Sequence, residues 1–215
     1  MRPSPFEVEI IYQDAAIVVV DKPGGLLSVP GRGPDRQDCV VRRIRNLFPA
    51  CISQPAVHRL DLETSGLMVL ALTAEAHKRL SFQFQHRKVE KQYLAILEGV
   101  VAEERGEIEL AFRLDVANRP YQMYDPVQGK WGITRWEKIA VTGHRTRLRF
   151  TPLTGRTHQL RTHAAHPLGL GCPIVGDRLY GRGKPGDRLH LHASRLCFQH
   201  PGKAETLCFE RPAWF

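Results

Sequence analysis

The chain has 215 residues, and its 42% hydrophobic and 25% charged residues exclude a disordered or fibrous protein. No stretch approaches the roughly 18 apolar residues of a membrane-spanning helix, and the opening segment MRPSPFEVEI lacks the apolar core of a signal peptide. The formal net charge is +9, which favours a polyanionic partner for what we expect to be a soluble, cytoplasmic protein.

The first predicted elements surround the breaker cluster Pro23-Gly24-Gly25. The apolar run Ile17–Val20 before the cluster predicts a strand, and the sequence LLSVPG after it predicts a second one. Further along, GLMVLALT, residues 66–73, is a continuous apolar run of strand length, so we expect a strand that is buried on both faces.

A helix is predicted directly after this buried strand. Thr73 can cap its first turn, which contains Glu75. Ala76, Leu80 and Phe84 follow at intervals of four residues, so they share one face of the helix. Because this spacing places apolar side chains on one side only, we expect that side to cover the core.

The second half of the chain alternates in the manner of strands. KQYLAILEG, the segment 147–152 and LHLHASRLCF each alternate with a period of two. Between the last two, Thr154-Gly155 predicts a turn, and Thr157 is a candidate cap for a short helix that carries Leu160 and Arg161. Strands dominate and helices are interspersed irregularly, so we predict an α+β fold with a mixed, largely antiparallel sheet.

The five cysteines are an odd and scattered set with no C-x-x-C spacing: Cys39, Cys51, Cys172, Cys197 and Cys208. We expect free thiols in a reducing compartment rather than a zinc ribbon or a disulfide scaffold.

The positive charge is concentrated in one part of the chain. Between His144 and Arg195 there are ten Lys and Arg residues against two acids, and nine of the ten cations are Arg. Arginine suits bidentate contact with phosphate and stacking on bases. Nucleic acid is therefore the expected partner, in preference to a merely solvated surface.

Asp61 lies in the stretch HRLDLETSGL, immediately before the predicted buried strand. A carboxylate at the edge of a core is costly unless it is paired or hydrogen bonded. One interpretation is a turn cap through Thr64 and Ser65. The other is a nucleophile or general base, which needs a partner cation to stay ionised. Local sequence leaves both open.

Four segments together carry a family resemblance. HRLDLETSGLMVLA, DKPGGLLSVPG, KQYLAILEG and LTGRTHQLRTHAAHPLGLGCPIVGD, with HLHASRLCFQHP after it, resemble the motifs of RluA-type pseudouridine synthases in their order and spacing. The resemblance runs from about Ile10 to Phe215. It implies the pseudouridine synthase catalytic fold, with helices flanking the sheet and a central RNA-binding cleft.

The resemblance also implies a reaction, the isomerisation of uridine to pseudouridine in RNA. Asp61 matches the catalytic aspartate of the family, and Arg161 is expected to pair with it and lower its pKa. Tyr93 is expected to lie against the target base. Without the family match, Arg161 could merely bind phosphate and Tyr93 could be an ordinary core aromatic.

Substrate-binding residues follow from the same resemblance. Arg59 is the candidate to fill the gap left by a flipped base, because the scissile bond is shielded in stacked RNA. Leu160 is expected to pack on the base, although most helical leucines are core residues. The remaining expected substrate-binding residues are His58, Arg156 and His158.

Metal and cofactor chemistry is not expected. His158 and His163 are five residues apart on the predicted helix and point in different directions. No Asp, Glu or Cys lies near them in sequence to complete a metal site. The implied isomerisation involves no redox change, so we expect neither a metal nor an organic cofactor.

The expected domain spans residues 1–215 as one catalytic domain without an S4-type RNA-binding domain, and we expect a monomer. The sequence is most similar to short members of the family that act on an anticodon-loop uridine of tRNA and on large-subunit rRNA. Tyr121, Trp131 and Gly132 depart from the lysine, proline and alanine expected there. The alternatives are a non-catalytic RNA-binding or ribosome-associated protein that retains the fold, and a ribonuclease or nucleosidase.

Overall fold

A computed structural model describes residues 8–215, which divide into two compact units. Unit 1 contains the described residues up to Lys91 together with Ala193–Trp214, and unit 2 contains Gln92–His192 and Phe215. Residues 1–7 lie outside the described residues. The expectation that the opening segment has no signal peptide and the first seven residues of the expected domain 1–215 fall on this part of the chain. Among the described residues, no helix combines the length and apolarity needed to cross a membrane.

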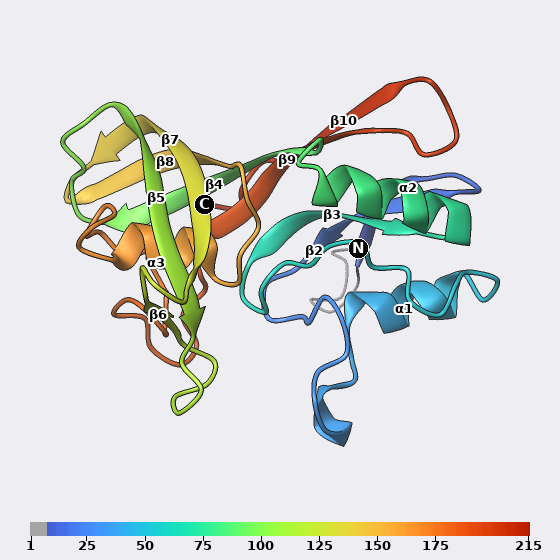
Figure 1. The fold of residues 1–215 in the computed structure, drawn as a ribbon, viewed down its shortest axis with the longest axis horizontal. Coiled ribbons are helices and arrows are strands. Elements are labelled where there is room, and N and C mark those ends of the chain that lie inside the picture. The colour runs from blue at the N-terminus through green and yellow to red at the C-terminus, as the bar shows by residue number, and fades with distance from the viewer. Residues whose placement is uncertain (1–7) are drawn as a thin grey trace. The chain divides into compact units, whose positions relative to one another are not determined.

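Unit 1 is built on a sheet with the strand order β1-β2-β3-β9-β10 (Figure 1). The strands are β1 (Glu9–Gln13), β2 (Ile17–Lys22), β3 (Ser65–Ala71), β9 (Leu191–Gln199) and β10 (Thr206–Glu210). β2 pairs antiparallel with both β1 and β3, and β10 pairs antiparallel with β9. Every residue of β3 is buried, as its continuous apolar run predicts.

One helix covers each face of the β2–β3 part of this sheet (Figure 1). Successive strand residues point to opposite faces, so the apolar residues of β2 divide between two cores. The core under α1 (Val40–Leu47) buries Val18, Val20 and Ile44, and the core under α2 (Ala74–Gln85) buries Ile17, Val19 and Leu80. A short 3-10 turn, η1 (Pro34–Arg36), precedes α1.

The beginning of α2 confirms the predicted cap. The Thr73 hydroxyl accepts a hydrogen bond from the backbone N–H of Ala76 at 3.2 Å, which satisfies one of the donors that the first turn leaves open. Ala76 and Leu80 are buried and Phe84 is partly buried against the same core. The four-residue spacing therefore marks the covered face of the helix.

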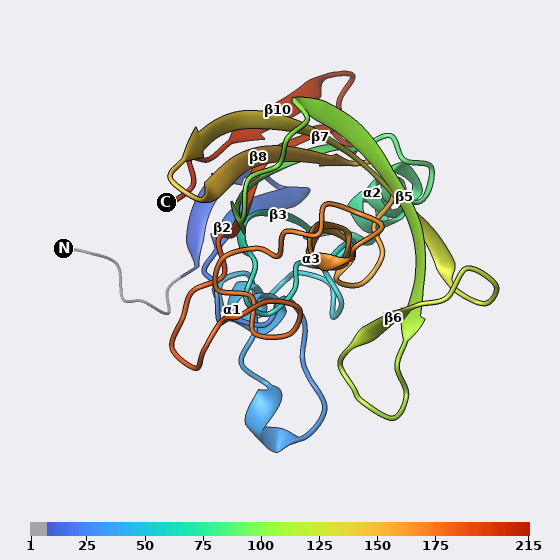
Figure 2. The ribbon, with the colours of Figure 1, turned by 90° about the vertical axis from the view of Figure 1, so that its left-hand side faces the viewer.

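Unit 2 is an antiparallel sheet with the order β4-β8-β7-β5-β6. Its strands are β4 (Glu90–Glu98), β5 (Arg105–Leu114), β6 (Gln122–Tyr124), β7 (Lys130–Thr142) and β8 (Arg145–Pro152). Figure 2 shows α3 (Gln159–Ala165) within the curve of β5, β7 and β8. Leu160 and Ala164 of α3 share a core with Trp136 and Phe150 of the strands. The predicted α+β fold with a largely antiparallel sheet is confirmed.

The second strand predicted after Pro23-Gly24-Gly25 is wrong. This segment makes only an isolated bridge between Leu27 and Cys39. Its carbonyl groups are used elsewhere, because Leu27 and Ser28 accept hydrogen bonds from the N–H groups of Val40 and Val41 at 2.8 and 3.2 Å. These N–H groups open α1 and have no partner within that helix. The segment therefore caps a helix instead of joining the sheet.

The predicted cap of α3 by Thr157 is also wrong. The N-cap residue is His158, which has a left-handed φ of 54° and no side-chain capping bond. The loop before the helix is tied by Gln159 instead, whose Oε1 accepts from the Arg156 N–H at 2.9 Å and from the Thr154 hydroxyl at 2.7 Å. The first residue of the helix thus fixes the turn that leads into it.

The cysteine prediction needs one correction. Cys197 and Cys208 form a disulfide, because they lie opposite each other in the register of β9 and β10. Cys39, Cys51 and Cys172 are free thiols, as expected.

Candidate active site

The loop that carries Asp61 is fixed from both sides of the chain. The Ser28 hydroxyl donates to the Leu60 carbonyl at 2.7 Å and accepts from the Leu60 N–H at 3.0 Å. Leu60 itself is buried in unit 1. The residue directly before Asp61 is therefore held by two hydrogen bonds and by apolar packing.

Lys22 is fully buried beneath this loop. Its Nζ donates to the carbonyls of Pro23 at 2.9 Å, Leu26 at 2.7 Å and Leu62 at 3.1 Å. Burial lowers the pKa of Lys22 from 10.5 to about 7, while the nearby negative charges of Asp61 and Asp21 oppose this shift. One ammonium thus joins the loop after β2 to the residue that follows Asp61.

The two loops also meet backbone to backbone. The Gly25 N–H donates to the Leu62 carbonyl at 2.8 Å. A Cβ atom on Gly24 would lie 2.9 Å from the Glu63 carbonyl oxygen, which is closer than a side chain tolerates. The glycines of the breaker cluster therefore allow the two loops to pack closely against each other, in addition to forming a turn.

The Asp61 carboxylate does not cap its own turn. It is partly buried, and the Thr64 hydroxyl donates no hydrogen bond to it. The Thr64 hydroxyl is buried without a hydrogen-bond partner among the described residues. A cap through the Thr64 hydroxyl is thus not supported, and the carboxylate remains a candidate for chemistry.

His58 and Arg59 differ in their surroundings. The His58 ring stacks on Phe84 with centroids 4.4 Å apart, and its Nε2 accepts from the Val69 N–H at 3.1 Å. Burial, and then the charge of Lys91, lower the pKa of His58 from 6.5 to about 3, so the ring is neutral at physiological pH. Arg59 is exposed. Their predicted roles in substrate binding stay predictions.

Arg161 is held by a buried carboxylate in unit 2. Its Nε and Nη2 donate to the two oxygens of Asp177 at 2.8 and 2.6 Å, and both residues are almost completely buried. Burial alone would raise the pKa of Asp177, but the hydrogen bond and charge of Arg161 and the N–H groups of Leu179 and Tyr180 lower it overall. The guanidinium orientation is therefore fixed before any substrate binds.

Tyr180 extends this cluster toward the loop before α3. The Arg161 guanidinium carbon lies 5.4 Å from the Tyr180 ring centre. The Tyr180 hydroxyl accepts from the Gln122 N–H and is hydrogen bonded to His158 Nδ1, both at 2.8 Å. Unit 2 thus brings together Arg161 and His158 of the predicted site residues.

The other predicted residues of unit 2 occupy different settings. Tyr93 lies opposite Phe150 in the β4–β8 register and is partly buried against the core. Leu160 is a buried core residue. Arg156 is exposed, and its Nε donates to the Trp131 carbonyl at 3.0 Å. The contacts of these residues with substrate stay predictions.

The sequence did not predict Lys22, Asp177 or Tyr180 as residues of the site. Lys22 continues the period of Val18 and Val20 on β2, and this spacing could have placed it on an inward face. Asp177 is the last residue of the segment LTGRTHQLRTHAAHPLGLGCPIVGD and one of two acids in a basic stretch, and these two signals could have marked it. Among residues 8–215, no three His, Cys, Asp or Glu side chains cluster as a metal site would require.

Comparisons with known proteins agree with the motifs of the site. Residues 16–166 match the family described as RNA pseudouridylate synthase. The dual-specificity RNA pseudouridine synthase RluA of Haemophilus influenzae is 42% identical over 212 residues, which cover 97% of this chain and 94% of the relative. The protein of the same name from Escherichia coli K12 is 42% identical over 210 residues, covering 96% and 93%.

A solved structure supports the same assignment. Human RNA pseudouridylate synthase domain containing 1 has a TM-score of 0.75 and 29% identity, and the match covers 99% of this chain and 87% of that one. The matched family segment includes Asp61, Tyr93 and Arg161. The chain belongs to the RNA pseudouridylate synthase family, and it is an RNA pseudouridine synthase.

Proposed function

We propose that this enzyme isomerises an anticodon stem-loop uridine of tRNA, uridines of 23S large-subunit rRNA, or both. The dual specificity in the names of its relatives supports more than one RNA substrate. The ten cations between His144 and Arg195 supply charge for the phosphate backbone. The enzyme acts as a monomer in the cytoplasm, and residues 1–215 form one catalytic domain.

Asp61 carries the chemistry. In the reaction the N1–C1′ bond of uridine breaks and a C5–C1′ bond forms, while C5 loses a proton and N1 gains one. A carboxylate can attack C1′, attack C6 of the base or assist deprotonation of the ribose. The observation that carries this proposal is the Asp61 loop, which Lys22 fixes while the carboxylate is left uncommitted to its turn.

Arg161 pairs with Asp61 in this proposal and keeps the carboxylate ionised. The bidentate bond to Asp177 supports the role, because it prevents the guanidinium from changing its orientation. Tyr93 lies against the target base and is placed to move a proton.

The target uridine is turned out of the RNA stack before it reacts. Arg59 fills the space that the base leaves, and its exposed side chain is consistent with this role. Leu160 packs against the base. His58, Arg156 and His158 complete the substrate-binding set. Because the overall change is an isomerisation, it consumes no oxidant, reductant or activated cofactor.

The test is Asp61→Asn, which keeps the size of the side chain but removes its charge and nucleophilicity. We expect the variant to fold, to melt within a few degrees of wild type and to bind RNA, yet to form no pseudouridine. Pseudouridine is measured by chemical mapping of total RNA from cells with and without the gene. A folded variant that still isomerises uridine would remove Asp61 from the mechanism.

The same experiment separates the alternative activities. A ribonuclease would shorten the RNA, and a nucleosidase would release free uracil. A non-catalytic RNA-binding protein would leave the pseudouridine map unchanged when the gene is removed. Pseudouridine formation leaves the mass and length of the RNA unchanged, so only the mapping reports it.

A further inference from the structure

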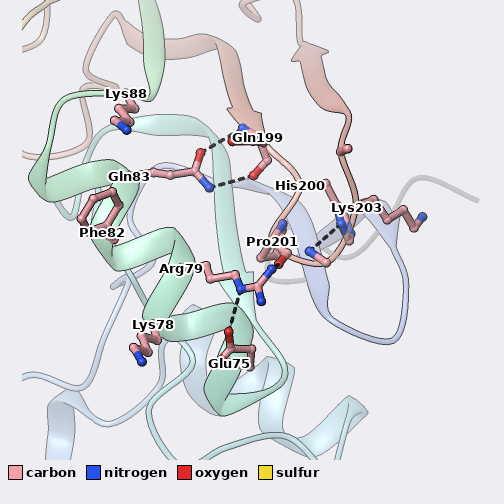
Figure 3. Close-up of a pocket in the computed structure, with 12 residues that line it drawn as sticks. Glu75, Lys78, Arg79, Phe82, Gln83, Lys88, Gln199, His200, Pro201 and Lys203 are labelled. Carbon is pink, nitrogen blue, oxygen red and sulfur yellow. Dashed lines mark hydrogen bonds and ion pairs between the residues drawn. The ribbon is translucent and has the colours of Figure 1, made fainter.

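A groove of about 670 Å³ lies in unit 1, between α2 and the turn that joins β9 to β10 (Figure 3). The helix side contributes Lys78, Arg79 and Phe82, and the turn contributes residues 199–204. Lys88, which follows α2, completes one end. No residue of this groove belongs to the site described above.

The floor of the groove is fixed by hydrogen bonds. The buried Gln83 amide donates to the Gln199 carbonyl at 2.8 Å and accepts from the Gln199 N–H at 2.9 Å (Figure 3). Arg79 Nη1 donates to the Pro201 carbonyl at 2.8 Å. These bonds join the helix to the turn, so the groove exists before any ligand arrives.

The groove is strongly cationic. Lys78, Arg79, Lys88 and Lys203 line it, against the single carboxylate of Glu75. Lys78 and Lys88 are exposed, and neither has a carboxylate partner among the described residues. A ligand that neutralises these charges would therefore displace no existing ion pair at either lysine.

Arg79 has donors left for such a ligand. Its Nε donates to Glu75 at 2.6 Å and its Nη1 to the Pro201 carbonyl. A guanidinium carries five N–H donors, so these two bonds leave part of the planar fork unused. That geometry matches the oxygens of a phosphate group.

Phe82 adds an apolar surface at the same groove. Its side chain is half exposed, and the Lys88 ammonium lies 5.2 Å from the centre of its ring. Cations beside an exposed aromatic ring suit an RNA strand, because the cations contact its phosphates while an aromatic ring packs against the adjacent nucleoside.

We propose that this groove binds backbone phosphodiesters of the substrate RNA and is a second contact, separate from the catalytic loop. The proposal rests on the proposed function, because it takes RNA as the ligand. Lys78 and Lys88 contact the phosphates as mobile point charges, and Arg79 contacts them through a fixed fork. Phe82 lies along the sugar.

The test compares two double variants in the Asp61→Asn background, so that the RNA is not modified during titration. Lys78→Gln with Lys88→Gln removes two charges from the groove. Arg42→Gln with Arg45→Gln removes two exposed charges from α1, as the matched control. The probe is unmodified tRNA from cells that lack the gene, and Kd is measured at salt concentrations from about 50 to about 200 mM.

We expect the groove variant to reduce the slope of log Kd against log salt by roughly 1.4, at about 0.7 for each of two single-strand phosphate contacts. When salt rises fourfold over this range, the Kd of the groove variant should increase by a factor about seven times smaller than the factor for the parent protein. The control variant should keep the parent slope. With Asp61 restored, the groove variant should keep kcat at saturating RNA and show a higher KM.

Three results would overturn the proposal. One is a groove variant with the slope and affinity of its parent. Another is an equal change in the control, which would make the effect one of net charge. The third comes from a second probe, inorganic pyrophosphate. A groove variant that no longer binds pyrophosphate but keeps its affinity for RNA would mean that the groove holds a small phosphate compound instead of RNA. If the parent protein does not bind tRNA at all, the proposed function fails instead.

Discussion

The buried ammonium of Lys22 gives a prediction that separates its role from that of ordinary lysines. Lys22→Met keeps the length and apolar character of the side chain and removes the charge. The substitution removes the ammonium that donates hydrogen bonds to the carbonyls of Pro23, Leu26 and Leu62. The Leu62 carbonyl still accepts a hydrogen bond from the Gly25 N–H. Each buried carbonyl left without a donor costs about 1–3 kcal/mol.

The dependence on pH follows from the lowered pKa of Lys22. Below pH 7 the lysine is protonated in both the folded and unfolded states, so burial of the charge opposes folding fully. Between a folded pKa of about 7 and an unfolded value of 10.5, the folded state has lost the proton while the unfolded state still holds it. Folding stability therefore rises with pH across this window, by about 1.4 kcal/mol per unit.

The assay is urea denaturation of wild type and Lys22→Met at about pH 7, 8 and 9. The difference in unfolding free energy between the two proteins cancels the titration of all other groups. We expect the advantage of wild type over the variant to grow by about 2 kcal/mol from pH 7 to pH 9. Lys78→Met, at an exposed position, serves as the control and should show a constant difference. A constant difference for Lys22→Met as well would refute the assignment of a buried, pKa-shifted lysine.

Three further substitutions test other parts of the structure. Asp177→Asn should lower the unfolding free energy by about 3–5 kcal/mol in urea denaturation, because it leaves the Arg161 charge buried without its counterion. Gly66→Ala should yield little soluble protein, since Gly66 has a φ of 114° and an added Cβ would lie 2.4 Å from a β9 carbonyl oxygen. Gly143→Ala is the control: φ is 58° and no atom lies near the added Cβ, so the unfolding free energy should fall by only about 1–2 kcal/mol. The pKa of His58 is about 3 in the folded state, so between pH 7 and pH 5 only the unfolded state gains the proton, and the unfolding free energy should fall by about 2 kcal/mol. His58→Gln should lose this part of the acid sensitivity, as measured by melting curves.

The elements that the sequence predicts are those with a strong local pattern. β2, β3 and α2 carry continuous or periodic apolar residues, and Thr73 marks the start of the helix. β5 has a weaker signal, because its alternation is confined to Glu107–Leu110 and is broken by Ala111, which is buried next to Leu110. α1 was missed because it has only eight residues and its N-cap is Cys39, whose Sγ accepts from the Arg42 N–H at 3.4 Å. Cysteine is not among the residues that usually mark a helix start.

In the candidate site, too, some residues could be predicted from the sequence and others could not. The motif HRLDLETSGL identifies Asp61, because the resemblance to a family depends on the residues themselves. The partners of the site depend on contacts between distant segments. Lys22 and Leu62 are 40 residues apart, and Arg161 and Asp177 are 16 apart. No local pattern reports such pairs, so their discovery required the fold.

The division of the chain also has a consequence for its synthesis. Apart from Phe215, unit 2 is one continuous segment, Gln92–His192, inserted into unit 1, whose sheet is completed by β9 and β10. Domains generally fold during translation in the order in which they emerge from the ribosome. Here the inserted segment Gln92–His192 is synthesised before the last strands of unit 1, and the unit that holds Asp61 extends to Trp214. A nascent chain therefore cannot complete the sheet of its Asp61 unit until β9 and β10, close to the end of the chain, have been synthesised.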